Sequence, residues 1–484
     1  MIDNEDFDVE EDDQLNKQKT SETLPDTINL NEVKEEEDID KLNDELYSDY
    51  KENICSMKAG SIQGSVFSLS SMALGTGAFA LPIRCSQIGC VWFCLSIIFG
   101  SIITYWTLSN LIKSARKVYG EEYSTYVKKI LGKIPAIIID FILMLYLFGI
   151  IIQFSVIIYA LIGRTYFEFF VDKTEYLEFD SFKTNIWNLY YIKLPVMFGL
   201  TALLIPLCLL KDISKMRFTS MIGVFALIYS ILVVVIETPW FYKDYIDNVY
   251  REDNSETHAN WFDITKGFTS ELNFFSSIAT IFFCYTCHPG AFPVFKSLKY
   301  NNEKRINQVF LRSIFLDLII YLSIAICGFL TSPLSKEPLI IFRKSIFKND
   351  IFMNIAKISL ALDLYLSIPV NYNSFRMSFF ILVFKTNRID TWKNIFVTLP
   401  VLILATFIGA IFEDILSYIA LLGGFCCSII CFLIPGCLMV KTSKEKIYSI
   451  RNILTIIIIG LLCCIGFTAG VLTVIRIASN KDVK

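Results

Sequence analysis

Apolar stretches of roughly 20 residues follow one another from about residue 62 to residue 477, with short polar breaks between them. An α-helix needs about 20 predominantly apolar residues to cross the hydrocarbon core of a bilayer. The pattern therefore predicts an all-α polytopic membrane protein. We expect eleven transmembrane helices, at about 62–83, 90–112, 134–162, 191–210, 217–237, 268–296, 308–330, 351–383, 394–412, 415–440 and 450–477.

The composition supports this class and separates the amino-terminal segment from the rest. Of the 484 residues, 54% are hydrophobic and only 19% are charged, which excludes a soluble globular protein because such domains carry about 25% charged residues. Residues 1–50 hold 19 acidic against 4 basic side chains and no apolar periodicity. We expect 1–58 to be a disordered, acidic cytosolic tail, either simply solvated or used for regulatory docking, and 59–480 to be the transmembrane domain. The tail has no apolar h-region, so no cleaved signal peptide is predicted.

The loops differ in basic content, which predicts the orientation. Five loops on the side of the amino terminus hold 20 Lys or Arg in 61 positions, and three long loops on the other side hold 10 in 78. Cytosolic loops carry the excess of basic residues, so the amino terminus is predicted to be cytosolic. One outer loop, 331–350, carries four basic residues against this trend.

Two of the predicted helices are interrupted. The stretch Gly64–Gly89 contains Gly75-Thr76-Gly77 and Pro82, and the sixth helix is expected to break at His288-Pro289-Gly290 and again at Pro293. Glycine and proline weaken a helix, and the peptide groups that they free must be satisfied by protein or by a water-lined cavity. With five helices in each half, the first and sixth helices correspond. This pairing is typical of an inverted-repeat transporter with its site near the midplane, whereas a bundle with two kinked helices is the plainer alternative.

Ionisable residues within the predicted spans are candidates for function because burial of charge is costly. Asp363 lies about 12 residues into the eighth helix and has three possible roles: cation ligand, proton carrier or partner of a basic residue. His288 either senses protons or caps the broken sixth helix. Asp317 follows Arg312 by five residues, a poor spacing for a direct pair, and we expect it to be structural. Asp140 is expected at the interface.

The chain lacks the sequence motifs of zinc binding, nucleotide binding and nucleophilic catalysis. The run Cys284-x-x-Cys287-His288 has no second pair of ligands for zinc and lies in an apolar span. There is no Walker-type loop and no nucleophile elbow. We therefore expect no enzyme activity, no cofactor, no structural metal and no nucleic-acid partner. Most of the fourteen cysteines lie in apolar runs, and a Cys85–Cys90 disulfide is the one pairing considered.

Four motifs resemble those of the amino acid/auxin permease family, and most closely its sodium-coupled neutral amino acid transporter branch. They are GSVFSLSSMALGTGAFALPIRCSQIG at 64–89, CHPGAFPVFKSLK at 287–299, DLYLSIPVNYNSFR at 363–376 and LLGGFCCSIICFLIPG at 421–436. They occur in the family's order over roughly 60–480, and the acidic tail lies outside the resemblance.

The resemblance implies a LeuT-like 5+5 inverted repeat with an eleventh helix, and secondary transport of amino acids driven by H⁺ or Na⁺. The freed amides at one half-helix suit a substrate carboxylate, and the unwound carbonyls at Tyr285–His288 suit its ammonium group. Phe67, Phe283 and Tyr285 are aromatic candidates for selectivity. The substrate-binding candidates are Ser71, Gly75, Thr76, Gly77, Phe283, Tyr285 and His288.

The candidates for ion or proton coupling are Ser68, Ser71, Asp363, Ser367 and His288. Sodium users of the family often carry an Asn shortly before the glycine triplet, and serines stand there in this chain. The missing Asn favours H⁺ as the coupling ion, although the hydroxyl of Ser367 keeps an oxygen cage for Na⁺ open. A second departure, Arg84, either lines the outer entrance or snorkels to the interface.

The partners expected are an amino acid and the lipid bilayer, with the protein as a monomer. The membrane is either the plasma membrane or a vacuolar or lysosomal membrane. A non-transporting sensor or scaffold that binds amino acids is the main alternative, and a channel is another. The sequence does not specify which amino acid is bound or the direction of transport.

Overall fold

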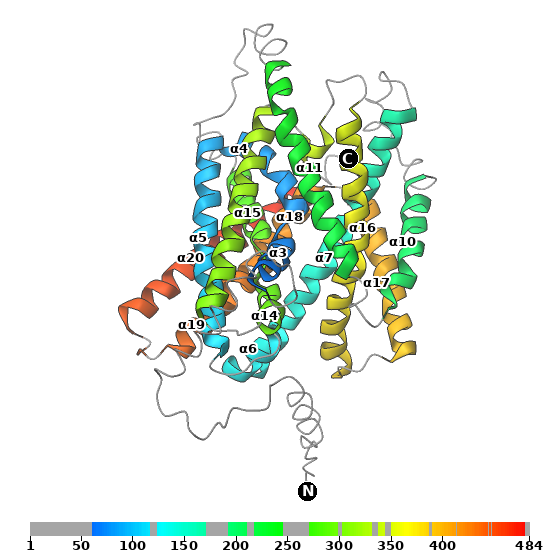
Figure 1. Ribbon diagram of the computed structural model, residues 1–484. Helices are drawn as coiled ribbons and strands as arrows, with labels where there is room; N and C mark the ends of the chain where they lie inside the picture. The colour runs from blue at the N-terminus through cyan, green and yellow to red at the C-terminus, as the bar shows by residue number, and fades with distance from the viewer. Residues whose placement is uncertain are drawn as a thin grey trace, which may run out of the picture. The chain divides into compact units, whose positions relative to one another are not determined.

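The computed structural model of the chain describes residues 61–116, 123–170, 192–210, 217–244, 271–298, 303–331, 337–343, 350–386, 390–412, 414–443, 445–446 and 448–479. The predicted acidic tail, 1–58, lies outside them. Within the described residues all regular structure is helical, and the helices form a bundle around α3 (Figure 1). The predicted all-α class is confirmed.

Nine helices or helix runs in the described part are long and apolar enough to cross a membrane, and a bent pair makes ten. The continuous ones are α5 (Cys90–Arg116), α7 (Lys133–Phe170), α11 (Arg217–Asp244), α15 (Glu303–Thr331), α16 (Ile351–Phe379), α17 (Thr391–Ile411) and α20 (Ile450–Ser479). Helix α10 (Leu194–Cys208) has 15 residues and is about 22 Å long at 1.5 Å per residue, which is short for a span. A short helix, α6 (Tyr123–Leu131), precedes α7.

Three spans are interrupted or irregular. The first consists of α3 (Ile62–Ala73), the 3₁₀ turn η1 (Thr76–Ala80) and α4 (Leu81–Ile88), with a bend of 51°. The second consists of α13 (Glu271–Cys284) and α14 (His288–Ser297). The third runs through α18 (Ile415–Leu421), the π-helix η7 (Leu422–Leu433) and α19 (Ile434–Thr442). Both interruptions expected from glycine and proline are therefore present.

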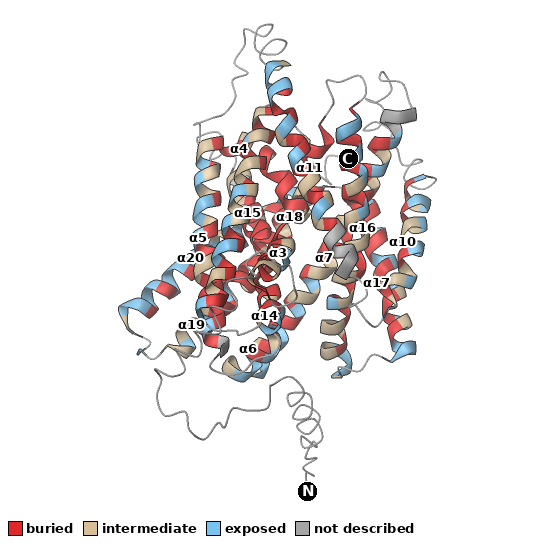
Figure 2. Cartoon of the chain, in the orientation of Figure 1, coloured by how far each residue is buried: buried red, intermediate tan, exposed pale blue. Residues whose placement is uncertain are grey.

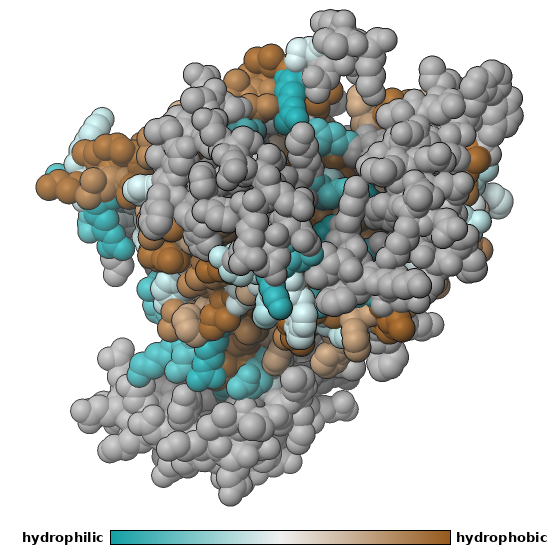
Figure 3. All heavy atoms as spheres, turned by 90° about the horizontal axis from the view of Figure 1, so that it is seen from above, coloured by the Kyte–Doolittle hydropathy of each residue, from teal (hydrophilic) through white to brown (hydrophobic). Residues whose placement is uncertain are grey.

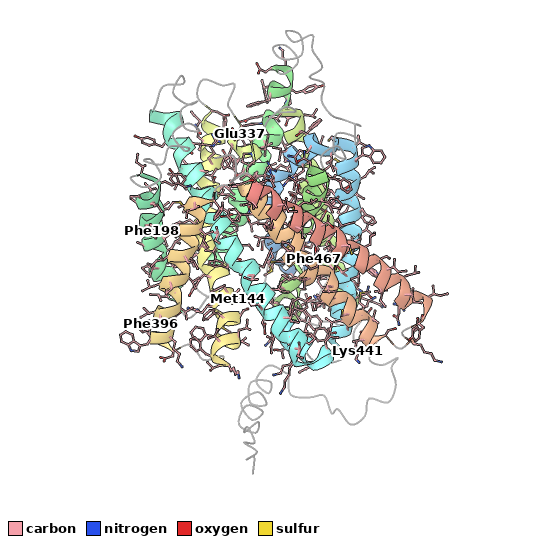
Figure 4. The ribbon with its side chains drawn as sticks, turned by 180° about the vertical axis from the view of Figure 1, so that it is seen from behind. Met144, Phe198, Glu337, Phe396, Lys441 and Phe467 are labelled. Carbon is pink, nitrogen blue, oxygen red and sulfur yellow. The ribbon has the colours of Figure 1, made fainter. Side chains whose placement is uncertain are left out.

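The outside of the bundle is apolar, as a lipid-facing surface requires. Phe396 of α17 is 74% exposed and points away from the bundle in Figure 4, and Leu203 of α10 is 69% exposed. Apolar residues also show at the rim of the end-on view (Figure 3). In Figure 2 the buried residues gather instead around α3 and α18. The protein is thus an integral multi-pass membrane protein.

Small residues bring η7 close to its neighbours. A Cβ added to Gly424 would lie 2.7 Å from the Gly466 carbonyl oxygen on α20, and one added to Gly423 would collide with the Ala279 carbonyl on α13. Membrane helices pack this closely only where side chains are absent. The glycine-rich motif at 421–436 therefore fixes α13, one of the two interrupted helices, in its position.

Candidate functional site

The interruption of α3 leaves three amides without helical partners. The last bond of α3 joins the Leu74 amide to the Ser70 carbonyl at 2.7 Å, and the next runs from the Ala78 amide to the Gly75 carbonyl at 3.2 Å. The intervening N–H groups belong to residues 75–77, at the positive end of the η1–α4 half-helix. Such a terminus attracts anionic groups.

The interruption of the sixth span lies at residues 285–287. The Tyr285 amide closes α13 on the Ile281 carbonyl at 3.1 Å, and the Cys287 amide turns back to the Tyr285 carbonyl at 3.0 Å. Helix α14 then starts at His288, with Pro289 in its first turn, where its missing N–H costs nothing. The sequence placed the break at His288-Pro289-Gly290, whereas these residues form the first turn of α14 and the break lies just before them. The second break expected at Pro293 was wrong, because Pro293 lies inside α14.

Tyr321 of α15 links the two breaks. Its hydroxyl lies 2.8 Å from the Ala73 carbonyl at the end of α3 and 2.8 Å from the Cys284 carbonyl at the end of α13. One hydroxyl proton is thus shared between two helix ends that would otherwise bury unsatisfied carbonyls. The sequence analysis missed Tyr321; a tyrosine in an otherwise apolar span was the only available signal.

Gly75 and Gly77 have different surroundings. No heavy atom lies within 4 Å of a Cβ added to Gly75, whereas one added to Gly77 would lie 2.8 Å from Sγ of Cys284 and 2.9 Å from Cδ1 of Phe283. The backbone of Gly75 is extended, a conformation open to any residue. Gly77 therefore serves the packing of η1 on α13, and Gly75 faces the open part of the site.

Helix α7 supplies a second polar contact that the sequence analysis missed. Nε2 of Gln153 donates to Oγ1 of Thr76 at 3.0 Å, and Oε1 of the buried Gln153 has no hydrogen-bond partner among the described residues. About two turns earlier on the same helix, Tyr146 contacts Phe283 edge-on at 6.2 Å between ring centroids. An amide in an otherwise apolar span was the signal.

Asp317, which was expected to be structural, lies on the face of α15 that contacts the broken helices. It stands between Ser313 and Tyr321 at four-residue spacing, so the three share one face of α15. Ser313 Oγ lies 2.9 Å from Ser70 Oγ on α3, and Asp317 is 1% exposed. Its Oδ1 has no hydrogen-bond partner in the described part of the chain.

His288 and Tyr285 are both buried. Nε2 of His288 lies 2.9 Å from Oγ1 of Thr107 on α5, so its ring joins two helices and does not cap α14, the role that the sequence had offered as one alternative. The Nδ1 atom has no partner among the described residues. Tyr285 contacts Tyr321 edge-on at 5.2 Å between centroids. The polar interior of the site thus extends from α15 to α5.

Apart from His288, the coupling candidates fall into two separate groups, one on α3 and one on α16. Ser68 is exposed, and Ser71 donates to the Ser68 carbonyl at 2.8 Å within α3. Ser367 donates to Oδ1 of Asp363 at 3.4 Å within α16, and Asp363 lies against Gly223 of α11. Within the described residues no hydrogen bond joins the serines of α3 to those on α16.

The structure changes the interpretation of Arg84 and of the Cys85–Cys90 pair. Arg84 is 2% exposed and donates to Oγ1 of Thr280 at 3.1 Å and to Oε1 of Gln87 at 2.8 Å, so the snorkelling interpretation was wrong. A guanidinium buried among hydroxyl and amide oxygens needs no contact with the interface. Cys85 and Cys90 are free thiols, so the considered disulfide is absent.

The segment 337–343 lies at the end of the bundle where Figure 4 labels Glu337. Two ion pairs hold it: Arg164 with Glu337 at 2.8 Å, and Arg343 with Glu237 of α11. Leu339 and Ile341 are fully buried between them. Burial lowers the pKa of Arg343 to about 10, so its guanidinium group keeps its charge at neutral pH.

Comparisons with known proteins identify a family and a shared fold. The family model described as "Transmembrane amino acid transporter protein" matches residues 58–473. The chain is 23% identical over 410 residues to the sodium-coupled neutral amino acid transporter 7 of Xenopus laevis, covering 80% of this chain and 82% of the relative. It also resembles the crystal structure of MhsT in complex with L-phenylalanine, with a TM-score of 0.51 and 15% identity, over 87% of this chain and 99% of that one.

Proposed function

Because this chain belongs to the family of transmembrane amino acid transporter proteins, we propose that it carries amino acids across a membrane by secondary active transport around its two broken helices. The resemblance found in the sequence motifs is thereby confirmed, and the protein is a transporter and not an enzyme. One observation supports the mechanism most directly. The hydroxyl of Tyr321 contacts the carbonyls of both Ala73 and Cys284, and so holds the two breaks next to each other.

The proposed substrate position follows from the polarity of the two breaks. The carboxylate of the amino acid binds the amides of residues 75–77, where Gly75 leaves open space. The ammonium group binds carbonyls at the α13–α14 break, around Tyr285 and His288. The rings of Phe283 and Tyr285 border the same region and set side-chain selectivity, and Ser71 is the hydroxyl on α3 nearest to it in sequence.

The proposed architecture is the LeuT-like 5+5 inverted repeat with an eleventh helix. The fold shared with MhsT supports it, as does the correspondence between the α3–α4 break and the α13–α14 break. In this proposal the short α10 is the fourth helix, and α20 is the eleventh. The amino terminus is cytosolic, and the end where 337–343 lies faces outward.

We further propose that the coupling ion is H⁺ and that Asp317 carries it. A carboxylate buried without a cation is costly, so Asp317 is expected to be protonated while it is buried and to release the proton when the site opens. Tyr285, Tyr321 and Cys287 are the titratable groups that interact with it electrostatically. All three are neutral side chains at physiological pH.

Na⁺ coupling is the second possibility. It requires an oxygen cage from Ser68, Ser71 and Ser367, together with Asp363, and the relative from Xenopus laevis is described as sodium-coupled. The serines of α3 would then have to approach α16 in another conformation. The separation of these two groups in the structure favours H⁺.

Uptake into proteoliposomes tests the function. Purified protein is reconstituted with an imposed inward proton gradient, and a panel of radiolabelled amino acids is offered with sodium or with choline. We expect concentrative uptake that follows the proton gradient and persists in choline. Tight binding without any flux would instead identify an amino acid sensor or scaffold, and currents far above carrier turnover would identify a channel.

A further inference from the structure

Three cysteines gather at the junction of α4 and α5, away from the two breaks. The Sγ atoms of Cys85, Cys90 and Cys94 all lie within 4.8 Å of one another. In the described part of the chain, no other group of three His, Cys, Asp or Glu side chains converges in this way. Cys85 and Cys90 are almost fully buried, and Cys94 is partly buried.

The backbone produces this convergence through one tight turn. Helix α4 ends at Ile88, and Gly89 adopts a φ of 91°, a conformation that glycine reaches without strain. Helix α5 starts immediately at Cys90, and Cys94 follows one turn later on the same face. Cys85, in the last turn of α4, is thereby brought against both.

We infer that Cys85, Cys90 and Cys94 form a binding site for a soft metal ion, with Cu(I) as the ion that the donor set favours. Three sulfur atoms placed about 2.3 Å from one metal in a plane are about 4 Å apart. The observed cluster needs only a small contraction to reach that arrangement.

The donor chemistry selects among metals. All three donors are thiols, and no carboxylate or imidazole joins them within the described residues. Hard cations such as Mg²⁺ and Ca²⁺ need oxygen ligands, and structural Zn²⁺ takes four ligands. Cu(I) is soft and is bound by thiolates alone. Each thiol that binds loses its proton to solvent, and no change in oxidation state is needed when the ion is supplied as Cu(I).

The alternative is that these cysteines only fill apolar space, as membrane cysteines commonly do. The other buried cysteines of the chain serve as a comparison. Cys426, Cys427 and Cys431 lie close in sequence on η7, yet their sulfur atoms do not form such a cluster. Proximity in sequence is therefore not what produces the group at the α4–α5 junction.

Metal binding here would tie α4 to α5. Helix α4 is the second half of the first broken helix, and Arg84 anchors it to α13 through Thr280. If the proposed alternating access is correct, α4 must move, and a bound metal restrains that movement. This consequence rests on the proposed function, whereas metal binding itself does not.

Binding is tested on the purified full-length protein under anaerobic, reducing conditions. Cu(I) is titrated in competition with a coloured Cu(I) chelator. We expect one tightly held Cu(I) per chain, and a loss of affinity of at least about 100-fold in Cys85→Ser and in Cys94→Ser. The matched control replaces the exposed thiols, Cys437→Ser with Cys464→Ser, and should bind as the unmodified protein does.

Three results would overturn the inference. They are equal Cu(I) affinity in the unmodified protein and in Cys85→Ser, loss of the ion in the Cys437→Ser, Cys464→Ser control, and tighter binding of Zn²⁺ than of Cu(I). Proteoliposome uptake provides the separate readout: Ag⁺ as a Cu(I) analogue should slow uptake by the control variant but not by Cys94→Ser. Absence of uptake in every variant would count against the proposed function and leave the titration to decide on the metal.

Discussion

Gln153 and Thr76 form a direct hydrogen bond, 3.0 Å from Nε2 to Oγ1, between the middle of α7 and the first residue of η1. This contact ties a continuous helix to the break in the first span. It also leaves the Gln153 Oε1 atom buried and without a partner in the described part of the chain, at the edge of the proposed substrate site.

We therefore predict that Gln153→Leu lowers amino acid uptake by at least about tenfold, because the lost hydrogen bond is worth about 1 kcal/mol and a buried hydroxyl is left unpaired. Ser155→Ala is the matched control on the same helix, since among the described residues its hydroxyl bonds only to the Ile151 carbonyl. Both variants are compared in proteoliposomes at equal protein content. Unchanged uptake by Gln153→Leu would remove this side chain from the site.

The two glycines of the first break are predicted to have different roles: Gly77 allows close helix packing, and Gly75 borders the space for the substrate. Gly77→Ala places a Cβ against Cys284 and Phe283, and such overpacking costs about 1–3 kcal/mol. We predict that this variant loses thermal stability in detergent. Gly75→Ala, with no atom within 4 Å of the new Cβ, should keep it.

Gly75→Leu extends this prediction to function. Its longer side chain fills the open space at the freed amides, so the protein should reach the membrane at normal amounts and fail to take up amino acids. Thermal stability by size-exclusion chromatography and uptake are measured on the same preparations. Normal uptake by Gly75→Leu would show that the substrate lies elsewhere.

Tyr321→Phe tests the link between the two breaks. The variant keeps the ring and its contact with Tyr285, but removes the hydroxyl from the Ala73 and Cys284 carbonyls. Burial of two unpaired acceptors should cost about 1–3 kcal/mol each, lowering thermal stability and uptake together. In the control Tyr365→Phe, the lost hydroxyl bonds to one carbonyl of the described part of the chain, that of Leu200, and the effect should be smaller.

The sequence was sufficient for nine of the expected spans and a bent tenth, and for the presence of both breaks, because apolar length and the positions of glycine and proline are local signals. It was insufficient for Tyr321, Gln153 and Asp317. Gln153 and Tyr321 act through contacts with residues distant in the sequence, as the bonds from Gln153 to Thr76 and from Tyr321 to Ala73 show. In the sequence, each is only a polar residue in an apolar helix.

Loop 331–350 is a second case in which the sequence alone was insufficient. Its basic residues contradicted the charge rule, and the structure explains one of them: Arg343 is buried against Glu237. A charge that is neutralised inside the protein gives no information about orientation. Single-sequence counting cannot distinguish such a residue from a loop charge in solvent.

The two ion pairs that hold segment 337–343 should control access from that end. Glu337→Arg places like charge against Arg164 and is expected to loosen the segment and lower uptake, and Arg164→Glu should do the same. The double exchange restores opposite charges and should recover part of the activity, with a coupling energy of about 0.5–3 kcal/mol. Additive losses in the double variant would mean that the pair does not hold the segment.

Asp317 and Asp363 offer a direct comparison of two buried carboxyls. Asp317 is 1% exposed, with an unpartnered Oδ1 beside the breaks, whereas Asp363 is half-buried and bonded to Ser367 on its own helix. If Asp317 carries the coupled proton, Asp317→Asn mimics the protonated carboxyl permanently, because an amide side chain does not ionise. Uptake should then become insensitive to an imposed proton gradient, while exchange of internal for external amino acid continues.

Asp363→Asn should keep the response to the proton gradient, because its partner Ser367 is retained. Uptake and exchange are measured in the same liposomes, with and without a gradient, at external pH values from 5.5 to 8. The reverse result, gradient dependence lost in Asp363→Asn and kept in Asp317→Asn, would move the coupling site to α16. Loss of both gradient dependence and exchange in Asp317→Asn would assign that carboxyl to substrate binding and not to the proton.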